Sequence, residues 1–223
     1  MKHLIDESDY DRVFAIGDIH GNSELLKRLL EKTKPTKNDM LIFLGDYINR
    51  GPDSKGVIDI LLALQDNTNT RFIMGNHDEM LLAALAGGAD NIKFFKKFGQ
   101  ATVDSYNLNF EVRNFPRPHA LFFADLLDYV ESDKHIFVHA SVEPNKPMVI
   151  QDTLFLRWNT ISSALAKGDF PHESGKTIIC GHEAGNNVIT YDWAICIDTG
   201  CSVKENGSLT AFDVKTRTPV TVV

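Results

Sequence analysis

The chain has 223 residues, of which 43% are hydrophobic and 24% are charged, and its formal net charge is -7. These values exclude a disordered or fibrous chain and suit one globular domain with a sizeable core. The negative charge argues against bulk binding of nucleic acid, which needs a basic surface to neutralise phosphates. We therefore expect a single domain over residues 1–223, with no nucleic acid partner.

The cysteines and the N-terminus bear on location. Three cysteines are present, they form no CxxC pair, and they are too few for a disulfide scaffold, which fits a reducing compartment. The first residues are acidic and lack the apolar run of a secretory signal, and no apolar stretch approaches the ~20 residues that span a bilayer. We expect a cytoplasmic protein outside the membrane. The oligomeric state stays open.

Short apolar runs alternate with helical patterns through the first third of the chain. Strands are expected at residues 12–16, 40–44 and 71–74, with helices at 23–32 and 57–64 between them. This is a β-α-β-α-β rhythm. A further apolar helical stretch stops at Gly87 and Gly88, and residues 89–130 then form an irregular, helix-like and locally basic segment. Its basic side chains fit a solvated face or, as an alternative, a helical segment on the substrate side.

The last third returns to short apolar runs separated by turn residues. Strands are expected at residues 134–138, 176–180, 188–190, 193–197 and 209–214. Parallel units early in the chain and a meander late in the chain predict an α/β (α+β) fold with mixed sheets.

Polar clusters follow five of these strands directly. They are GDIHG (17–21), GDYINRG (45–51), GNHDE (75–79), HAS (139–141) and GHE (181–183). Loops at the carboxyl ends of strands carry ligand chemistry in α/β folds, so we expect the five loops to converge on one site. The glycines before the polar residues should let the backbone turn sharply off each strand.

These loops supply two carboxylates, three imidazoles and one amide, a set of oxygen and nitrogen donors that suits Mn²⁺, Fe or Zn²⁺. The candidate metal ligands are Asp18, His20, Asp46, Asn76, His139 and His182. Six side chains are too many for one ion. If Asp46 bridges two ions about 3.5–4 Å apart, one ion takes Asp18 and His20 while the other takes the remaining three. We expect two divalent ions, Mn²⁺ before Fe or Zn²⁺.

Such a site keeps a net positive charge, because two aspartates offset only half the charge of two divalent ions. It would attract a phosphate dianion and lower the pKa of a bridging water toward neutrality, so that a metal-bridging hydroxide attacks phosphorus directly. Arg50 is placed to hold phosphate oxygens through its planar guanidinium, and Arg157 is a second candidate. The pattern predicts a phosphoesterase.

The five motifs in order resemble the signature series of the calcineurin-like metallophosphoesterase superfamily, over about residues 12–213. The likeness is closest to the phosphoprotein phosphatase branch, and LFLRW and IDTGC resemble stretches of small bacterial and phage serine/threonine protein phosphatases and of symmetrical diadenosine tetraphosphatases. The resemblance implies a four-layer α/β/β/α sandwich with two mixed sheets and metals on the six ligands. It also implies His77 as the general acid at the leaving oxygen, with Arg50 and Arg157 as phosphate-binding residues.

One position departs from the family pattern. The family usually reads GDYVDRG, with a second acid that hydrogen-bonds the catalytic histidine, and that position is Asn49 here. An amide oxygen can orient His77 but stabilises its protonated form less than a carboxylate would. We therefore hypothesise a preference for good leaving groups, which need little protonation. Asp78 or Glu79 could be the partner of His77 instead, and the sequence leaves that choice open.

Three functions follow as expectations. The first is a metal-dependent phosphatase that acts on a phosphorylated protein or a small phosphoester, as a serine/threonine or dual-specificity protein phosphatase. The alternative is a nucleotide hydrolase like the bis(5'-nucleosyl)-tetraphosphatases, which Asn49 and the basic middle segment favour slightly. The third, from another class, is an inactive binding module with this fold. Inactive members lose ligands, and here all six are present.

Overall fold

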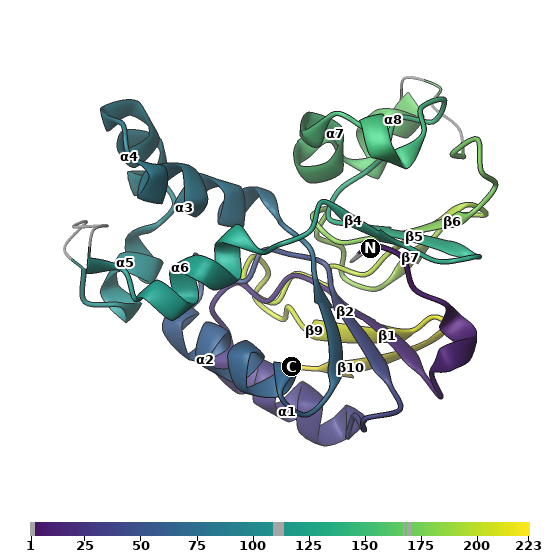
Figure 1. Ribbon diagram of the computed structural model, residues 1–223, viewed down its shortest axis with the longest axis horizontal. Coiled ribbons are helices and arrows are strands. Elements are labelled where there is room, and N and C mark those ends of the chain that lie inside the picture. The colour runs from purple at the N-terminus through teal and green to yellow at the C-terminus, as the bar shows by residue number, and fades with distance from the viewer. Residues whose placement is uncertain (1–2, 109–113, 167, 169–170) are drawn as a thin grey trace.

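The computed structural model describes residues 3–108, 114–166, 168 and 171–223, and its strands form two five-stranded sheets (Figure 1). The first sheet has the order β10-β9-β1-β2-β3 and is built from β1 (Val13–Ile16), β2 (Met40–Phe43), β3 (Asn69–Phe72), β9 (Leu209–Asp213) and β10 (Thr218–Val222). The first three strands are parallel, whereas β9 is antiparallel to both of its neighbours. The sheet is therefore mixed, as expected.

The second sheet has the order β4-β5-β6-β8-β7 and is built from β4 (Tyr129–Glu131), β5 (His135–Val138), β6 (Thr177–Cys180), β7 (Ile189–Thr190) and β8 (Ala194–Cys196). Its three central strands are parallel and both edge strands are antiparallel. The central strands are buried on both faces, which is why they read as continuous apolar runs in the sequence.

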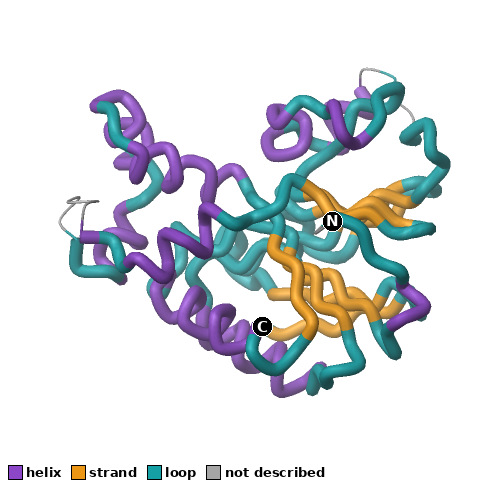
Figure 2. The backbone as a smooth tube through the Cα atoms, viewed as in Figure 1, coloured by secondary structure: helices purple, strands orange, loops and turns teal. Residues whose placement is uncertain are grey.

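Alternation along each strand places side chains in different layers. Val13 and Ala15 of β1 belong to a buried cluster shared with Phe137 and Ile179 of the second sheet, so this cluster fills the space between the sheets. Figure 2 shows the two sets of strands stacked one above the other. Phe14, between Val13 and Ala15, belongs instead to the cluster on the outer face of the first sheet.

Helices cover the two outer faces and complete the four-layer sandwich. The first sheet is covered by α1 (Ser23–Thr33) and α2 (Ser54–Gln65), through buried residues such as Leu26 and Val57. The second sheet is covered by α7 (Thr153–Trp158) and α8 (Ile161–Ala166), through Leu156 and Ile161. Single turns of 3-10 helix occur at η1 (Glu7–Asp9) and η3 (Met148–Ile150).

The middle of the chain forms a helical region at one side of the sandwich (Figure 1). It consists of α3 (Asn76–Ala86), α4 (Ala89–Lys96), α5 (Gln100–Ser105) and α6 (Arg117–Ala124). The expected segment at 89–130 is therefore helical over α4 to α6 and ends in β4, while its residues 109–113 lie outside the described residues.

Several elements differ from the sequence prediction for physical reasons. β3 begins earlier than expected. Its first residues are polar and partly exposed at the edge of the sheet, so they lack the apolar pattern from which a strand is predicted. β10 is a largely exposed edge strand and carries Pro219, so it lacks the apolar run of a buried strand. The helices α7 and α8 are short and give little periodicity.

No helix among the described residues is long and apolar enough to span a bilayer.

An ion pair closes the start of the first sheet. The guanidinium of Arg12 donates to both carboxylate oxygens of Asp39, at 3.0 and 2.7 Å. Burial raises the pKa of Asp39, but hydrogen bonds from Arg12 and Thr36 outweigh burial and hold it below its ordinary value of 3.8. The pair therefore favours the ionised form of Asp39.

Candidate metal centre

The loops after β1, β2 and β6 are joined to one another. The N–H groups of Ile19 and His20 donate to the carbonyl of Asp46 at 3.1 and 2.8 Å. The N–H of His182 donates to the Asp18 carboxylate at 3.1 Å, which ties the second sheet to the first. The loops that the sequence predicts to converge therefore do meet, at the carboxyl ends of the parallel strands.

Left-handed backbone is concentrated in these loops. Among the described residues, positive φ angles outside glycine occur at eight positions, and five of these are His20, Asp46, Asn49, Arg50 and His182. Such a conformation costs a residue other than glycine ~1–3 kcal/mol and persists only where the surroundings enforce it. Its concentration among the predicted site residues is what a built functional site shows.

Asp46 lies between two groups of nitrogen donors. Its Oδ2 is 3.4 Å from Nε2 of His20, and its Oδ1 is 3.6 Å from Nε2 of His139. Asp18 Oδ2 lies 3.8 Å from the same nitrogen of His20. Because each oxygen of Asp46 faces a different histidine, this carboxylate has the geometry of a bridging ligand.

The remaining candidate ligands lie on the His139 side of Asp46. Asn76 Oδ1 is 3.2 Å from Nε2 of His139. Ligand atoms of Asp46, His139 and His182 all lie within 4.8 Å of one another. The structure thus brings the six predicted ligands together around Asp46, and His77 lies in one group with His20 and Asp46.

Backbone carbonyls determine which ring nitrogen each histidine can offer. Nδ1 of His20 and Nδ1 of His139 each lie 2.9 Å from a carbonyl oxygen, so each carries a hydrogen and leaves Nε2 with a free lone pair. His182 is turned the other way, because its Nε2 donates to the carbonyl of Trp158 at 3.1 Å. Its Nδ1 would therefore be the ligand.

The protonation states of the site fit cation binding. Burial lowers the pKa of His139 to about 3 and that of His182 to about 4, so both rings are neutral ligands at neutral pH. Burial also raises the pKa of Asp46 to about 7, and burial together with the carboxylates of Asp198 and Asp46 raises the pKa of Asp18 well above its usual range. Cations would replace these protons.

One buried atom shows directly that the donors suit a cation. Nε2 of His20 is buried, and among the described residues it has no hydrogen-bond partner, although two carboxylates face it. A buried polar atom without a partner is costly and calls for an explanation. A divalent ion between His20, Asp18 and Asp46 would satisfy it, so the residues present fit a dinuclear centre.

Asp78 supports the loop that carries Asp46. Its Oδ2 accepts the N–H groups of Asp46 at 2.8 Å and Gly75 at 2.9 Å, and its Oδ1 accepts the N–H of Tyr47 at 3.1 Å. A Cβ at Gly75 would lie 2.2 Å from Asp46 Oδ1, so glycine is needed here for close approach, while its φ of -89° suits any residue. Gly75 therefore avoids a Cβ clash where the chain leaves the strand, as expected.

His77 is held by Asn49. Nδ2 of Asn49 lies 2.9 Å from Nδ1 of His77, and the hydroxyl of Thr102 donates to Oδ1 of Asn49 at 2.6 Å. Because an amide nitrogen only donates, Nδ1 of His77 accepts and the ring hydrogen resides on Nε2. The sequence interpretation had the amide oxygen orienting His77, and the contact is made by the amide nitrogen instead. Thr102 was not foreseen, because it lies 53 residues further along the chain.

Arg50 completes the predicted catalytic group. Its exposed guanidinium has Nη2 at 3.4 Å from Nε2 of His77. Burial, followed by the charge of Arg50, lowers the pKa of His77 to about 3, so the ring is neutral. Two donors then face one another across a long contact. An anionic phosphate oxygen between them would accept hydrogen bonds from both.

Comparison with known proteins decides the family. Residues 11–186 match the family described as calcineurin-like phosphoesterase. The chain belongs to the calcineurin-like phosphoesterase family.

The relatives of this phosphoesterase include nucleotide hydrolases. It is 37% identical over 134 residues to a symmetrical bis(5'-nucleosyl)-tetraphosphatase of Buchnera aphidicola subsp. Acyrthosiphon pisum (strain Tuc7), a match that covers 59% of this chain and 44% of the relative. The chain thus spans less than half the length of this curated relative.

Solved structures share the fold over nearly the whole chain. One described as a candidate diadenosine tetraphosphatase has a TM-score of 0.72 at 22% identity and is matched over 98% of this chain and 96% of its own. A protein serine/threonine phosphatase from Saccharomyces cerevisiae has a TM-score of 0.65 at 16% identity, over 98% and 81% of the two chains. At these identities the likeness shows the fold alone.

The phosphoesterase also has a site carboxylate that the sequence interpretation missed. Asp198 is 4% exposed, accepts the N–H of Gly200 at 2.8 Å, and acts on the pKa of Asp18 more than any other charged group does. Asp198 follows β8 just as the predicted ligands follow their strands. Its position after a strand, in the IDTG stretch, could therefore have identified it from the sequence. The site therefore contains a third carboxylate besides Asp18 and Asp46, which the charge balance expected from the sequence did not include.

The second arginine of the phosphoesterase is engaged by acids. The guanidinium of Arg157 forms ion pairs with Glu79 and Asp128, and Glu79 also accepts the indole N–H of Trp158 at 2.7 Å. Glu79 is thus not the partner of His77. The phosphate-binding role predicted for Arg157 would require a phosphate to replace at least one of these carboxylates.

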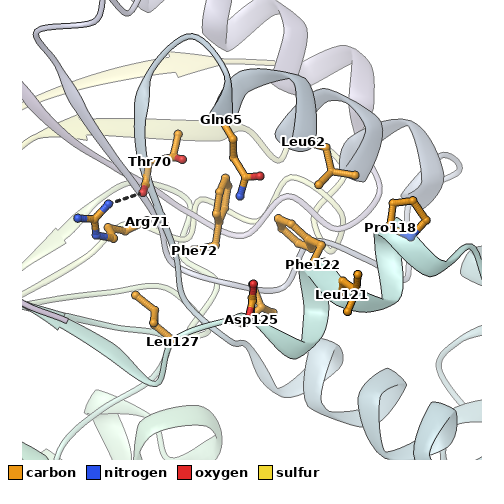
Figure 3. A pocket seen from close by; sticks show the side chains of 11 residues that line it. Leu62, Gln65, Thr70, Arg71, Phe72, Pro118, Leu121, Phe122, Asp125 and Leu127 are labelled. Atoms are coloured by element: carbon orange, nitrogen blue, oxygen red, sulfur yellow. Dashed lines mark hydrogen bonds between the residues drawn. The ribbon is translucent and has the colours of Figure 1, made fainter. Parts of the chain in front are cut away.

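A pocket of the phosphoesterase lies away from this centre. It has a volume of about 380 Å³ and opens between α2, β3 and α6, where Leu62, Phe72 and Leu121 line it (Figure 3). None of its lining residues is a predicted site residue. The metal centre is instead a surface where buried ligands meet the exposed Arg50.

Proposed function

We propose that this protein is a dinuclear metal-dependent phosphoesterase that cleaves dinucleoside polyphosphates. The observation that carries the proposal is the similarity to a symmetrical bis(5'-nucleosyl)-tetraphosphatase, combined with the convergence of all six predicted ligands. This reading was the alternative in the sequence analysis, and it now replaces the protein phosphatase as our first choice. The convergence of the ligands does not support an inactive binding module.

The site would hold two divalent ions, one with Asp18 and His20 and one with Asn76, His139 and His182, both on Asp46. Bound there, the ions would act as Lewis acids that activate water and withdraw charge from the phosphoryl group. The donor set suits Mn²⁺, with Fe or Zn²⁺ as alternatives.

The protein side chains orient the phosphoryl group and assist its departure. Arg50 is exposed beside the centre and would neutralise a non-bridging phosphate oxygen. His77 presents the hydrogen on Nε2, because Asn49 donates to its other nitrogen. A neutral imidazole stabilises a departing oxygen by hydrogen bonding but transfers a proton less readily than an imidazolium.

This arrangement suits a leaving group that needs little protonation. A nucleoside diphosphate departs as a stable anion, whereas a serine alkoxide must be protonated as it leaves. The amide contact to His77 therefore supports a nucleotide substrate over a phosphoserine substrate.

Side-by-side hydrolysis of diadenosine tetraphosphate and a phosphoserine peptide, with Mn²⁺ supplied, tests the proposal. We expect diadenosine tetraphosphate to give two molecules of ADP with the higher kcat/KM. An Asp46→Asn variant should lose both activities, because it removes the bridging carboxylate. A higher kcat/KM for the phosphopeptide would overturn the substrate assignment, and full activity in Asp46→Asn would overturn the metal site.

A further inference from the structure

Two exposed phenylalanines extend outward from the catalytic histidine. The ring of Phe98 packs edge-on against His77 with centroids 5.9 Å apart and an interplanar angle of 78°. Phe94 packs edge-on against Phe98 in turn, at 5.8 Å and 71°. The three rings form a series that begins at the reacting centre and ends at the surface.

The exposure of this pair is unusual for the chain. Phe94 is 42% exposed and Phe98 is 47% exposed, and no other aromatic side chain among the described residues is in the exposed class. Exposed aromatic surface beside a reacting centre is a feature of ligand sites.

A buried neighbour fixes the direction of both rings. Phe95 is 1% exposed and packs against Gly99, where an added Cβ would lie 2.5 Å from its ring. Phe95 occupies the core side of α4, whereas Phe94 near the end of α4 and Phe98 in the turn after it are both exposed. The pair is therefore presented by a well-packed segment.

The charge around the pair favours an anionic ligand. The same segment carries Lys93, Lys96 and Lys97 in a chain with a net charge of -7, and Lys97 Nζ lies 5.8 Å from the ring centroid of Phe94. Planar rings beside ammonium groups suit a ligand that combines an aromatic group with phosphates, which is the chemistry of a nucleotide.

The distance of each phenylalanine from His77 distinguishes two kinds of aromatic substrate, because Phe98 contacts His77 and Phe94 lies beyond Phe98. In a phosphotyrosine the ring is bonded directly to the leaving oxygen, so it would reach Phe98 beside His77 and stop there. In a nucleotide, phosphates and a ribose separate the base from the leaving oxygen, so the base can reach the outer ring of Phe94.

We propose that Phe94 and Phe98 form the binding site for the nucleobase of the leaving nucleotide. This inference rests on the proposed nucleotide hydrolysis, and it makes the end of α4 and the turn after it the part of the molecule that selects nucleotides. Stacking on an aromatic side chain tolerates any base, so the site should accept purines and pyrimidines alike.

Binding of ADP and of pyrophosphate to the Mn²⁺-loaded protein tests the site without turnover. Pyrophosphate lacks the nucleoside, so the ratio of its Kd to the Kd of ADP reports what the nucleoside contributes, and loss of this contribution in the phenylalanine variants assigns it to the base. We expect Phe94→Leu and Phe98→Leu each to lower this ratio about tenfold, as loss of a stacking contact does. The matched control is Leu121→Ala, which removes an exposed apolar side chain on α6 and should keep the wild-type ratio.

Two results would overturn the inference: a wild-type ratio near one, or a ratio that both phenylalanine variants retain. A third would also do so, namely variants that impair hydrolysis of a phosphotyrosine peptide while the ratio stays unchanged. The proposed function fails separately, if the wild-type protein shows the expected ratio but does not cleave diadenosine tetraphosphate.

Discussion

Replacing Asp78 with asparagine should weaken both the fold and the metal centre. An asparagine oxygen in place of Oδ2 can keep the bonds from Asp46 and Gly75, but its NH₂ group would then face the N–H of Tyr47. A buried donor left without an acceptor costs ~1–3 kcal/mol. For a protein of this size, about 2 kcal/mol corresponds to a fall in Tm of roughly 4–8 °C.

The same change should reduce metal affinity, because Asp78 holds the backbone of the bridging ligand. Loss of a group that orients a ligand typically costs about 10- to 100-fold in metal binding. Urea unfolding of the Mn²⁺-loaded protein and Mn²⁺ titration of the metal-free protein measure the two effects. Asp90→Asn, an exposed change on α4, is the control. Wild-type Mn²⁺ affinity in Asp78→Asn would refute the reasoning.

Three further predictions follow from other contacts. Asn49→Asp places a carboxylate beside His77 and should raise kcat for an alkyl phosphate several-fold more than for an aryl phosphate; an equal change for both would contradict this. Glu79→Gln weakens the ion pair with Arg157 and leaves the guanidinium freer to bind phosphate, so the Ki of inorganic phosphate should fall about two- to fivefold. A rise in Ki would show that Glu79 instead positions the arginine. Asp39 has a pKa below 3.8 in the folded protein, so its stabilisation is present above that pH and is lost as the pH falls below it; acid unfolding of Asp39→Asn should lack this loss, and an unchanged pH profile would count against it.

The sequence predicts the parts of the fold that bury continuous apolar runs. The parallel strands β1, β2, β5 and β6 are recovered to within a residue or so, because both of their faces are covered. β10 is missed because most of it faces solvent at a sheet edge, and α7 is missed because six residues carry little helical period. The prediction thus fails where a strand is largely exposed or a helix is too short to show a periodic apolar pattern.

The candidate site divides in the same way. Its predicted ligands follow strands, so local sequence reveals them, and the structure brings them together. The contacts that hold the other predicted site residues do not share that signal: Thr102 reaches Asn49 across 53 residues, and Glu79 reaches Arg157 across 78. Such contacts depend on how the helical region folds back on the loops, which motif spacing does not encode.

The helical region connects substrate choice to catalysis through one short segment. Phe98 packs edge-on against the ring of His77, and Thr102, four residues later, donates to the amide of Asn49 that contacts Nδ1 of the same ring. A shift of this segment would move the nucleobase site and the hydrogen-bonding state of His77 together. Substitutions there should therefore change KM for nucleotides and the dependence on leaving group in concert, whereas changes at Arg50 should affect all phosphoesters alike.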